Sequence, residues 1–429
     1  MQRPASSPWV AMVDCNNFYV SCERVFDPAL ENTPVVVLSN NDGCVIARSE
    51  EAKALGVAMG EPEYKRRPFF AHHGVRVFSS NYALYGDMSA RVHEILCGFS
   101  SEVERYSIDE CFLLLRHRDR DALLALATEI RRTILRWTGI PVCVGLAWTR
   151  TLAKIANRLA KKRPDAGGVW MLDDPASTRR ELAGLEVGDV WGIGWRSAAK
   201  LHRLGVHTAL DLTQRTRDWV REKLTVCGLR TALELQGIPA ILMEDAPPAA
   251  SITCSRSFGT RIGDRPSLEE AVSAYVQRAA IKLRSRGLLA GAVQVFLSTA
   301  RHAPGPQYSG SGSLPLPLPS DYTPALLERA RTILRDVYRP GYRYQKAGVL
   351  LLDLTPRGMR QLTFAECGRE PLSQREKGLM SALDAVNARY GRDALRFAGS
   401  GVGPKPWHMR QRHLSQRFTT SWDELPRVR

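Results

Sequence analysis

Three carboxylates lie at the ends of predicted strands. Asp14 follows the apolar run 9–13, and Asp109 and Glu110 lie inside a predicted hairpin over 103–115. Hard divalent cations prefer oxygen ligands, and a two-metal site needs about three carboxylates to hold its ions roughly 3.5–4 Å apart. Because adjacent strand residues point to opposite faces, Asp109 and Glu110 can share a site only where the chain turns or bulges. The residues alone allow a two-metal site or a set of acids at a hairpin end.

A strongly amphipathic helix is predicted over 151–162. Its apolar residues repeat at helical spacing, and the cations Lys154, Arg158 and Lys161 share the opposite face. Such a stripe suits a triphosphate, whose negative charge moves to the leaving pyrophosphate during transfer. A solvated surface is the alternative.

The segment 187–205 has the pattern of a helix-hairpin-helix. A short helix leads into Gly192-Ile-Gly194, and a second helix, which carries Lys200, ends at Gly205. Glycine lets the backbone approach closely, so N–H groups at the N-terminus of the second helix can bind a DNA phosphate without reading base sequence. The alternative for these glycines is a tight turn.

Strands and helices alternate along the first 170 residues, which predicts an α/β sheet domain. The predicted strands are 9–13, 35–38, 103–115 and 142–148, and the predicted helices are 87–97 and 121–137. Breaks at 164–175 and 245–250 enclose a helical segment. The region after residue 250 follows a β-α-β-β-α-β pattern: strand 252–258, helix 268–286, strands 291–299 and 308–318, helix 324–338 and strand 347–354. Ser267 and Glu270 predict a capping box on its first helix, and a last helix is predicted near 373–390.

The charge of the chain favours a polyanionic partner. Its 60 Lys and Arg against 44 Asp and Glu give a formal net charge of +16. Residues 1–250 nearly balance at 32 basic and 30 acidic groups, whereas residues 251–360 carry 16 and 7. Nucleic acid is the favoured partner, and anionic lipid or solubility alone are the alternatives.

Cysteine usage and hydropathy exclude several protein classes. The nine Cys form no C-x-x-C pair and the nine His are scattered, which disfavours a zinc ribbon or a disulfide framework and fits a reducing compartment. No apolar run approaches the roughly 18 residues of a membrane span, and the N-terminus lacks a signal-peptide core. We therefore expect a cytoplasmic protein without membrane association.

Six stretches, in this order, resemble the Y-family DNA polymerases, and most of all their UmuC-type members, the catalytic subunits of bacterial DNA polymerase V. They are Asp14-Cys-Asn-Asn-Phe-Tyr-Val-Ser-Cys-Glu23, Val35-Val-Val-Leu-Ser-Asn-Asn-Asp-Gly-Cys-Val-Ile-Ala-Arg48, Phe78-Ser-Ser-Asn-Tyr82, Tyr106-Ser-Ile-Asp-Glu110, Val190-Trp-Gly-Ile-Gly194 and Cys254-Ser-Arg-Ser-Phe-Gly259. The resemblance covers nearly the whole chain. It implies an α/β (α+β multidomain) right-hand polymerase with five parts: palm (9–32 and 88–178), small fingers (33–87), helix-hairpin-helix thumb (179–245), β-α-β-β-α-β little finger (251–358) and C-terminal basic extension (359–429).

The resemblance also implies a reaction. Asp14, Asp109 and Glu110 would bind two Mg²⁺ ions, and the carbonyl of Cys15 would also face a metal. The primer 3′-hydroxyl would attack the α-phosphorus of a dNTP, with pyrophosphate leaving in line. Because small fingers and an open site tolerate distorted templates, the expected function is error-prone translesion synthesis in DNA repair and SOS-type damage tolerance.

Further site residues follow from the same resemblance. Phe18 and Tyr19 would lie at the incoming nucleotide, with Tyr19 as a steric gate against a 2′-hydroxyl; a packed core tyrosine is the alternative. The candidates for triphosphate contacts are Arg48, Lys53 and Lys161. The candidates for DNA contacts are Gly192, Gly194, Lys200 and Arg256.

The chain departs from the wider family at two places. Where many members carry a Tyr and an Arg over the nucleotide, this chain has Glu50 and Lys53, and Lys lacks the bidentate fork of Arg. Gln361-Leu-Thr-Phe364 faintly resembles a sliding-clamp-binding peptide, but the usual Leu-Phe ending is replaced by Phe-Ala. The resemblance further implies a processed UmuD-type subunit and a RecA filament as partners, neither of which can be read from residues.

Two other functions compete with a polymerase. A non-catalytic DNA-binding accessory protein of the bypass machinery is disfavoured by retention of all three acids and Tyr19. Another palm enzyme, such as a nucleotide cyclase, is disfavoured by the helix-hairpin-helix and the basic segment 251–360. Primer-template DNA and dNTPs are therefore the expected substrates.

Overall fold

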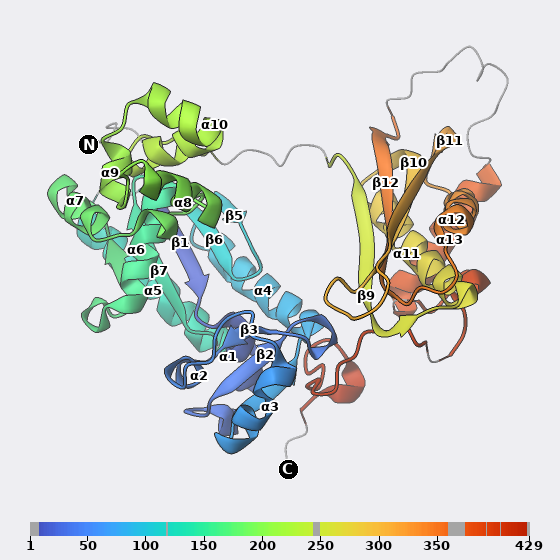
Figure 1. Ribbon diagram of the computed structural model, residues 1–429. Coiled ribbons are helices and arrows are strands. Elements are labelled where there is room, and N and C mark those ends of the chain that lie inside the picture. The colour runs from blue at the N-terminus through green and yellow to red at the C-terminus, as the bar shows by residue number, and fades with distance from the viewer. Residues whose placement is uncertain are drawn as a thin grey trace. The chain divides into compact units, whose positions relative to one another are not determined.

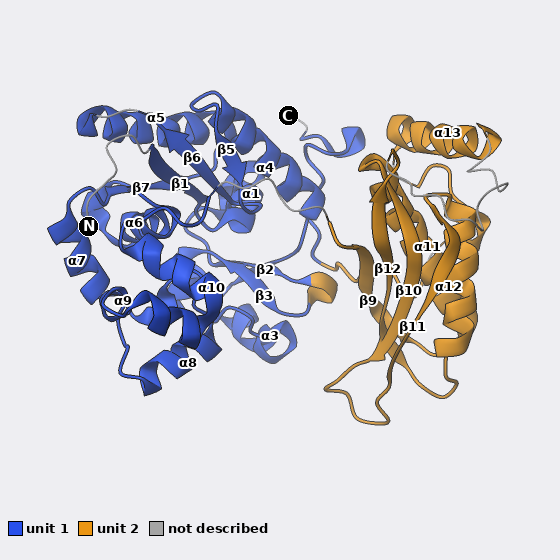
Figure 2. Cartoon of the chain, turned by 90° about the horizontal axis from the view of Figure 1, so that it is seen from above, with its two compact units in different colours: residues 1–39, 43–244, 413–429 blue, residues 40–42, 245–412 orange. Residues whose placement is uncertain are grey.

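The computed structural model describes residues 8–116, 119–242, 249–358, 374–391, 393–403 and 405–426. The chain (Figure 1) divides into two units (Figure 2). The first unit is formed by residues 1–39, 43–244 and 413–429, and the second by residues 40–42 and 245–412. In the described parts of the chain, no helix is long and apolar enough to cross a membrane.

A five-stranded sheet in the order β5-β6-β1-β7-β8 lies at the centre of the first unit. Its strands are β1 (Trp9–Cys15), β5 (Val103–Arg105), β6 (Glu110–Leu115), β7 (Val142–Ala147) and β8 (Val169–Met171). The central strand β1 runs antiparallel to both β6 and β7. Ala11 and Val13 enter one buried cluster, whereas Val10 and Met12 enter another. Burial on both faces explains the continuous apolar run 9–13.

Helices cover both faces of this sheet. They are α1 (Phe18–Phe26), α4 (Tyr82–Cys97), α5 (Arg120–Thr138) and α6 (Arg150–Lys162). The first three pack on the face of Ala11, and α6 packs on the face of Met12. Asn157 on α6 donates from Nδ2 to the main-chain oxygens of Met12 (3.1 Å) and Cys143 (2.7 Å). These bonds attach α6 to the two strands beneath it.

A smaller sheet and a group of helices complete the first unit. The sheet has the order β3-β2-β4, with β2 antiparallel to β3 and parallel to β4. Its elements are β2 (Val35–Leu38), β3 (Val45–Arg48), β4 (Arg76–Ser79), α2 (Glu50–Ala54) and α3 (Glu63–His72). The later helices are α7 (Pro175–Ala183), α8 (Trp195–Arg203), α9 (Ala209–Thr213) and α10 (Arg217–Leu235).

The second unit is an antiparallel sheet in the order β11-β10-β12-β9, with α11 and α12 packed on one face (Figure 2). Its elements are β9 (Ile252–Ile262), α11 (Arg265–Ser285), β10 (Leu288–Thr299), β11 (Ser309–Ser320), α12 (Thr323–Val337), β12 (Tyr344–Pro356) and α13 (Gln374–Tyr390). The edge strand β11 contains Pro315, Pro317 and Pro319, whose spacing of two puts the three missing N–H groups on one side of the strand, as an edge position tolerates. Within the described residues, the short 3₁₀ helices are η1 (Pro28–Leu30), η2 (Asn40–Asp42), η3 (Pro164–Ala166), η4 (Val187–Asp189), η6 (Ala398–Ser400) and η7 (Trp422–Glu424).

The predicted capping box at Ser267 and Glu270 is wrong. Helix α11 begins at Arg265, and its N-cap is Asp264, whose side chain accepts a hydrogen bond from the N–H of Ser267 at 2.8 Å. Pro266 fits in the first turn because its missing N–H would have no partner inside the helix. The true start signal is therefore Asp264 followed by a proline.

Most other predicted elements are confirmed. The mixed α/β class and the β-α-β-β-α-β order after residue 250 agree with the structure, and the last predicted helix, near 373–390, is observed as α13. The borders of palm, fingers, thumb and little finger stay predictions.

We predict that Gly145→Ala destabilises the first unit. A Cβ on Gly145 of β7 would lie 2.1 Å from the N of Asn157 and 2.3 Å from the O of Ala153, both backbone atoms of α6. Overpacking typically costs about 1–3 kcal/mol, and a clash with backbone belongs at or above the upper end. The measurement is the urea midpoint of the full chain.

Gly86→Ala is the matched control. Gly86 lies inside α4 with open space around its would-be Cβ, so alanine should leave the midpoint unchanged or raise it by up to about 1 kcal/mol of stability. Equal midpoints for Gly145→Ala and the wild type would contradict the close approach of α6 to β7.

Candidate active site

The three predicted acids are neighbours on β1 and at the start of β6. Asp14 lies directly opposite Glu110 in the antiparallel pair, and the N–H of Cys15 donates to the carbonyl of Asp109 at 2.9 Å. Opposed residues of an antiparallel pair carry their side chains on the same face of the sheet. Asp14 and Glu110 therefore both face α6.

A tight turn precedes β6 and carries Asp109. The N–H groups of Tyr106 and Ser107 both donate to the carbonyl of Glu110 at 3.1 Å. The Ser107 hydroxyl donates to Asp109 Oδ1 at 2.6 Å and accepts from the N–H of Glu110 at 3.1 Å. Because the regular strand begins only at Glu110, strand alternation does not constrain Asp109. The chain thus turns at the point where a shared site requires it to.

Two lysines of α6 pair with two of these acids. Lys161 Nζ lies 2.6 Å from Asp14 Oδ1, and Lys154 Nζ donates to both carboxylate oxygens of Glu110 at 2.9 and 3.0 Å. The four side chains line a cavity of about 450 Å³ on the α6 face. Lys154 also lies 4.4 Å from the ring centre of Tyr106, a cation–π contact. Two cations of the predicted stripe, Lys154 and Lys161, therefore pair with the carboxylates of Glu110 and Asp14.

Burial raises the pKa of Asp14 to about 6, and although Lys161 opposes this shift, Glu110 and Asp109 add to it. A carboxylate in this position needs a cation to stay ionised. In the described residues, no three His, Cys, Asp or Glu side chains converge as a metal-binding group. Instead, ammonium groups supply the positive charge at Asp14 and Glu110. The donors fit a hard divalent cation because they are carboxylates that already attract cations.

Tyr19 lies in the first turn of α1, shortly after the strand that carries Asp14. Its ring stacks on Tyr85 of α4 at 4.5 Å between centroids and 15° between planes, and meets Tyr82 edge-on at 6.1 Å. Its phenol is half-buried, and burial raises the pKa of Tyr19, with a smaller contribution from Asp109. Phe18 is buried in the core at 3% exposure, so a nucleotide would meet its main chain rather than its ring.

The other two candidates for triphosphate contacts differ in availability. Arg48 donates from its guanidinium to the carbonyl of Val57 inside the β3 region. Lys53 Nζ donates to Asn17 Oδ1 at 2.8 Å and to Glu50 Oε1 at 2.7 Å. Because Asn17 precedes Phe18, the structure brings Lys53 to the N-terminus of α1. The bond to Val57 uses one guanidinium nitrogen of Arg48, while its Nε is buried without a hydrogen-bond partner among the described residues.

The predicted helix-hairpin-helix has the expected backbone. Gly192 has φ +89°, a conformation that favours glycine, and a Cβ there would lie 2.8 Å from the Thr231 hydroxyl. Gly194 is the N-cap of α8, and both glycines are exposed. Lys200 Nζ donates to the carbonyl of Lys223 at 2.6 Å, which holds this side chain against α10. This bond uses one of the three donors of the Lys200 ammonium, and the DNA contacts of Gly192, Gly194 and Lys200 stay predictions.

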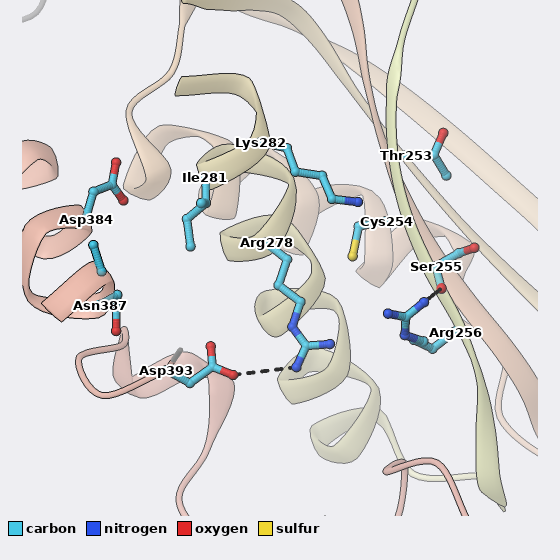
Figure 3. A pocket seen from close by; sticks show the side chains of 11 residues that line it. Thr253, Cys254, Ser255, Arg256, Arg278, Ile281, Lys282, Asp384, Asn387 and Asp393 are labelled. Atoms are coloured by element: carbon cyan, nitrogen blue, oxygen red, sulfur yellow. Dashed lines mark hydrogen bonds and ion pairs between the residues drawn. The ribbon is translucent and has the colours of Figure 1, made fainter. Parts of the chain in front are cut away.

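The last DNA-contact candidate, Arg256, lies in the second unit. Figure 3 shows Arg256 on β9 with Arg278 and Lys282 on α11, around a cavity of about 560 Å³. Asp393 lies 3.6 Å from Arg278 and partly neutralises the group. A cluster of cations, of which Arg256 and Lys282 are exposed and Arg278 is half-buried, suits phosphate oxygens, and the DNA contact of Arg256 stays a prediction.

Known proteins resemble this chain along its length. Residues 13–158 match the impB/mucB/samB family, residues 249–364 match its C-terminal domain, and residues 377–428 match a domain of unknown function, DUF4113. Protein ImpB of Salmonella typhimurium is 44% identical over 425 residues, 98% of this chain and 99% of the relative. The chain belongs to the impB/mucB/samB family.

Other comparisons agree with this membership. Protein UmuC of Salmonella typhimurium (strain LT2) is also 44% identical, over 98% of this chain and 100% of the relative. A solved Y-family DNA polymerase chimera of Dbh and Dpo4 matches with a TM-score of 0.65 at 21% identity, covering 81% of this chain and 99% of that one. The predicted resemblance and the Y-family polymerase fold are confirmed.

In this impB/mucB/samB family chain, sequence reasoning missed three contributors to the site. Lys154 was placed in the cationic stripe but not among the site residues, although its spacing of seven from Lys161 puts both on one helix face. Trp191 donates from its indole to the Tyr106 hydroxyl at 3.0 Å, and Tyr85 supports Tyr19. These two aromatic contacts join segments far apart in sequence, and no local pattern signals them.

We predict that, in the absence of divalent cations, Asp14→Asn stabilises this family member at pH 7.5. A folded-state pKa of about 6 against 3.8 means that the folded protein holds the proton more tightly, so wild-type stability falls as pH rises between those values. The raised pKa already includes the attraction of Lys161, and two pKa units correspond to about 3 kcal/mol, so the expected gain is at most about 3 kcal/mol. The measurement is the urea unfolding midpoint of the variant and of the wild type in EDTA from pH 4.5 to 8. The difference between the two midpoints should become smaller toward low pH.

Asp174→Asn is the control, because hydrogen bonds at the N-terminus of α7 lower the pKa of Asp174 and asparagine caps a helix equally well. This variant should show no gain at pH 7.5. If Asp14→Asn has the same urea midpoint as the wild type at every pH in this range, the ionised Asp14 carboxylate does not destabilise the folded protein.

Proposed function

We propose that this chain catalyses template-directed, error-prone DNA synthesis past lesions. The observation that carries the proposal is the opposed pair Asp14 and Glu110, with Asp109 at the adjoining turn, in a Y-family polymerase fold. A DNA polymerase IV of Moorella thermoacetica, 29% identical over 409 residues, supports a polymerase activity. A role without chemistry leaves the clustered acids unexplained.

Asp14, Asp109 and Glu110, with the carbonyl of Cys15, would hold two Mg²⁺ ions. When bound, these ions lower the pKa of the primer 3′-hydroxyl and stabilise charge on the phosphates. The 3′-oxygen forms a bond to the α-phosphorus as the bond to pyrophosphate breaks, and the hydroxyl proton passes to water. No side chain is required as a strong base.

The two lysines have separate roles in this proposal. Lys161 is partly exposed, and its side chain can turn from Asp14 to a triphosphate oxygen once Asp14 has another cation. Lys154 is more buried, is enclosed by Tyr106 and Trp191, and keeps Glu110 oriented. Lys53 is the second cation available to the triphosphate.

The expected partners follow from family likeness. A processed UmuD-type subunit fits a chain that is 44% identical to Protein UmuC, and we propose that the two act together in the SOS response, in the cytoplasm. RecA and the sliding clamp stay predictions, and Gln361–Phe364 lies outside the described residues.

The first prediction from this function is that Asp109→Ala abolishes primer extension. Loss of a metal-binding carboxylate removes several kcal/mol of transition-state stabilisation, which is a rate loss of roughly a hundredfold or more. The measurement is extension with Mg²⁺ and dNTPs on undamaged and abasic templates, with and without a UmuD-type partner.

Glu102→Ala is the matched control. Glu102 is an acid near the same sheet that pairs with Arg116 outside the site, so this variant should extend normally. If the wild type extends no primer under any of these conditions, the polymerase proposal fails.

The second prediction is that Tyr19→Ala admits ribonucleotides. Removal of the ring opens space at the 2′-position, so the ratio of kcat/KM for dATP over ATP should fall by at least about tenfold, the equivalent of roughly 1.4 kcal/mol. Single-nucleotide insertion kinetics measure the ratio. Tyr19→Phe keeps the ring and is expected to retain the wild-type ratio; an unchanged ratio in Tyr19→Ala would refute the gate.

A further inference from the structure

The C-terminal segment 413–418 packs on the first unit, although the second unit precedes it in the chain. Ser79 and His413 exchange two bonds: the N–H of Ser79 donates to the His413 carbonyl at 2.9 Å, and the N–H of His413 donates to the Ser79 hydroxyl at 3.0 Å. Phe418 stacks on Phe26 of α1 at 4.5 Å and 7°. This segment lies within the match to a domain of unknown function.

Ser415 is the centre of the contact. Asn81 Nδ2, at the N-cap of α4, donates to the Ser415 hydroxyl at 3.0 Å and to the carbonyl of Gln416 at 3.1 Å. The Ser415 hydroxyl in turn donates to Glu23 Oε1 at 3.1 Å. The tail therefore joins α1 and α4 through one hydroxyl.

The same carboxylate oxygen holds Tyr85. The Tyr85 hydroxyl donates to Glu23 Oε1 at 2.6 Å, and Glu23 and Tyr85 are only 2% and 0% exposed. Burial raises the pKa of Glu23, and the bonds from Tyr85 and Ser415 oppose that shift. A buried carboxylate is stable only while its donors remain in place. Ser415 therefore helps to hold the group that fixes the Tyr85 ring.

The ring of Tyr85 packs directly against the proposed gate, because it stacks on the ring of Tyr19 with 4.5 Å between the ring centroids. A steric gate acts by repulsion, which changes steeply over a fraction of an ångström. We propose that Ser415 is a positioning residue for Tyr19, acting through Glu23 and Tyr85 to set discrimination between deoxyribose and ribose, and that the stack of Phe418 on Phe26 anchors the Ser415 segment on α1. This inference rests on the proposed role of Tyr19 and assigns a task to part of the region 377–428, which matches the domain of unknown function.

The test is the dATP-over-ATP ratio of kcat/KM in the full chain, with its partner subunit where extension requires one. Ser415→Ala, Phe418→Ala and a chain ending at residue 412 should each lower the ratio, by about three- to tenfold. Ser415→Thr keeps the hydroxyl and should retain the wild-type ratio. Gln416→Ala is the control, because the contact of Gln416 with Asn81 is made by its main-chain carbonyl.

A general loss of folding would lower both rates together and leave their ratio unchanged, so thermal melting is measured alongside. Tyr85→Phe removes the other donor to Glu23, and its effect on the ratio should be non-additive with that of Ser415→Ala because both act through one oxygen.

The two proposals fail in different ways. If Tyr19→Ala leaves the ratio unchanged, the gate itself is refuted. If Tyr19→Ala lowers the ratio while Ser415→Ala, Phe418→Ala and the shortened chain keep the wild-type value, the positioning role of the tail is refuted.

Discussion

The register between β1 and β6 places Asp14 opposite Glu110, and the rest of the site depends on it. A slip of one residue would turn Asp14 toward the face of Ala11 and away from α6. Packing prevents that slip, because Ala11 and Val13 fill one buried cluster while Val10 and Met12 fill another. The apolar residues of the strand therefore determine where its single carboxylate points.

Helix α6 connects packing to charge. Its apolar face lies so close to β7 that a glycine is needed at position 145, and Asn157 bonds to both strands beneath it. This close approach lets Lys154 and Lys161 reach Glu110 and Asp14. These two ion pairs reduce the repulsion among the carboxylates, which would bind metal ions in a polymerase. A helix packed less closely could not bring both ammonium groups to these two acids.

The sequence predicted these parts well because they follow local rules. The run 35–38 matches β2 residue for residue, and the helix predicted over 151–162 differs from α6 only at its first residue. The strands β3 and β4, of four residues each, were not predicted, and neither was β8, whose three residues lie inside the predicted break 164–175, because strands this short show weak alternation. The start of α11 was missed because Ser267-x-x-Glu270 imitates a capping box just inside the true N-terminus. The pairing of Lys154 with Glu110 needed the fold, because a cationic stripe does not show what it faces.

The C-terminal tail shows the limit of local rules most clearly. Ser415 and Asn81 are 334 positions apart, and the segment around Ser415 has no helical or strand periodicity. What makes the contact specific is a buried carboxylate that needs donors, and hydroxyls from distant segments, Tyr85 and Ser415, meet that need. An aromatic ring held by such a carboxylate has less freedom than a ring held by packing alone, because the hydrogen bond fixes its tilt. In the proposed gate, Tyr19 rests against this ring, so a distant hydroxyl would contribute to sugar selection without touching the nucleotide.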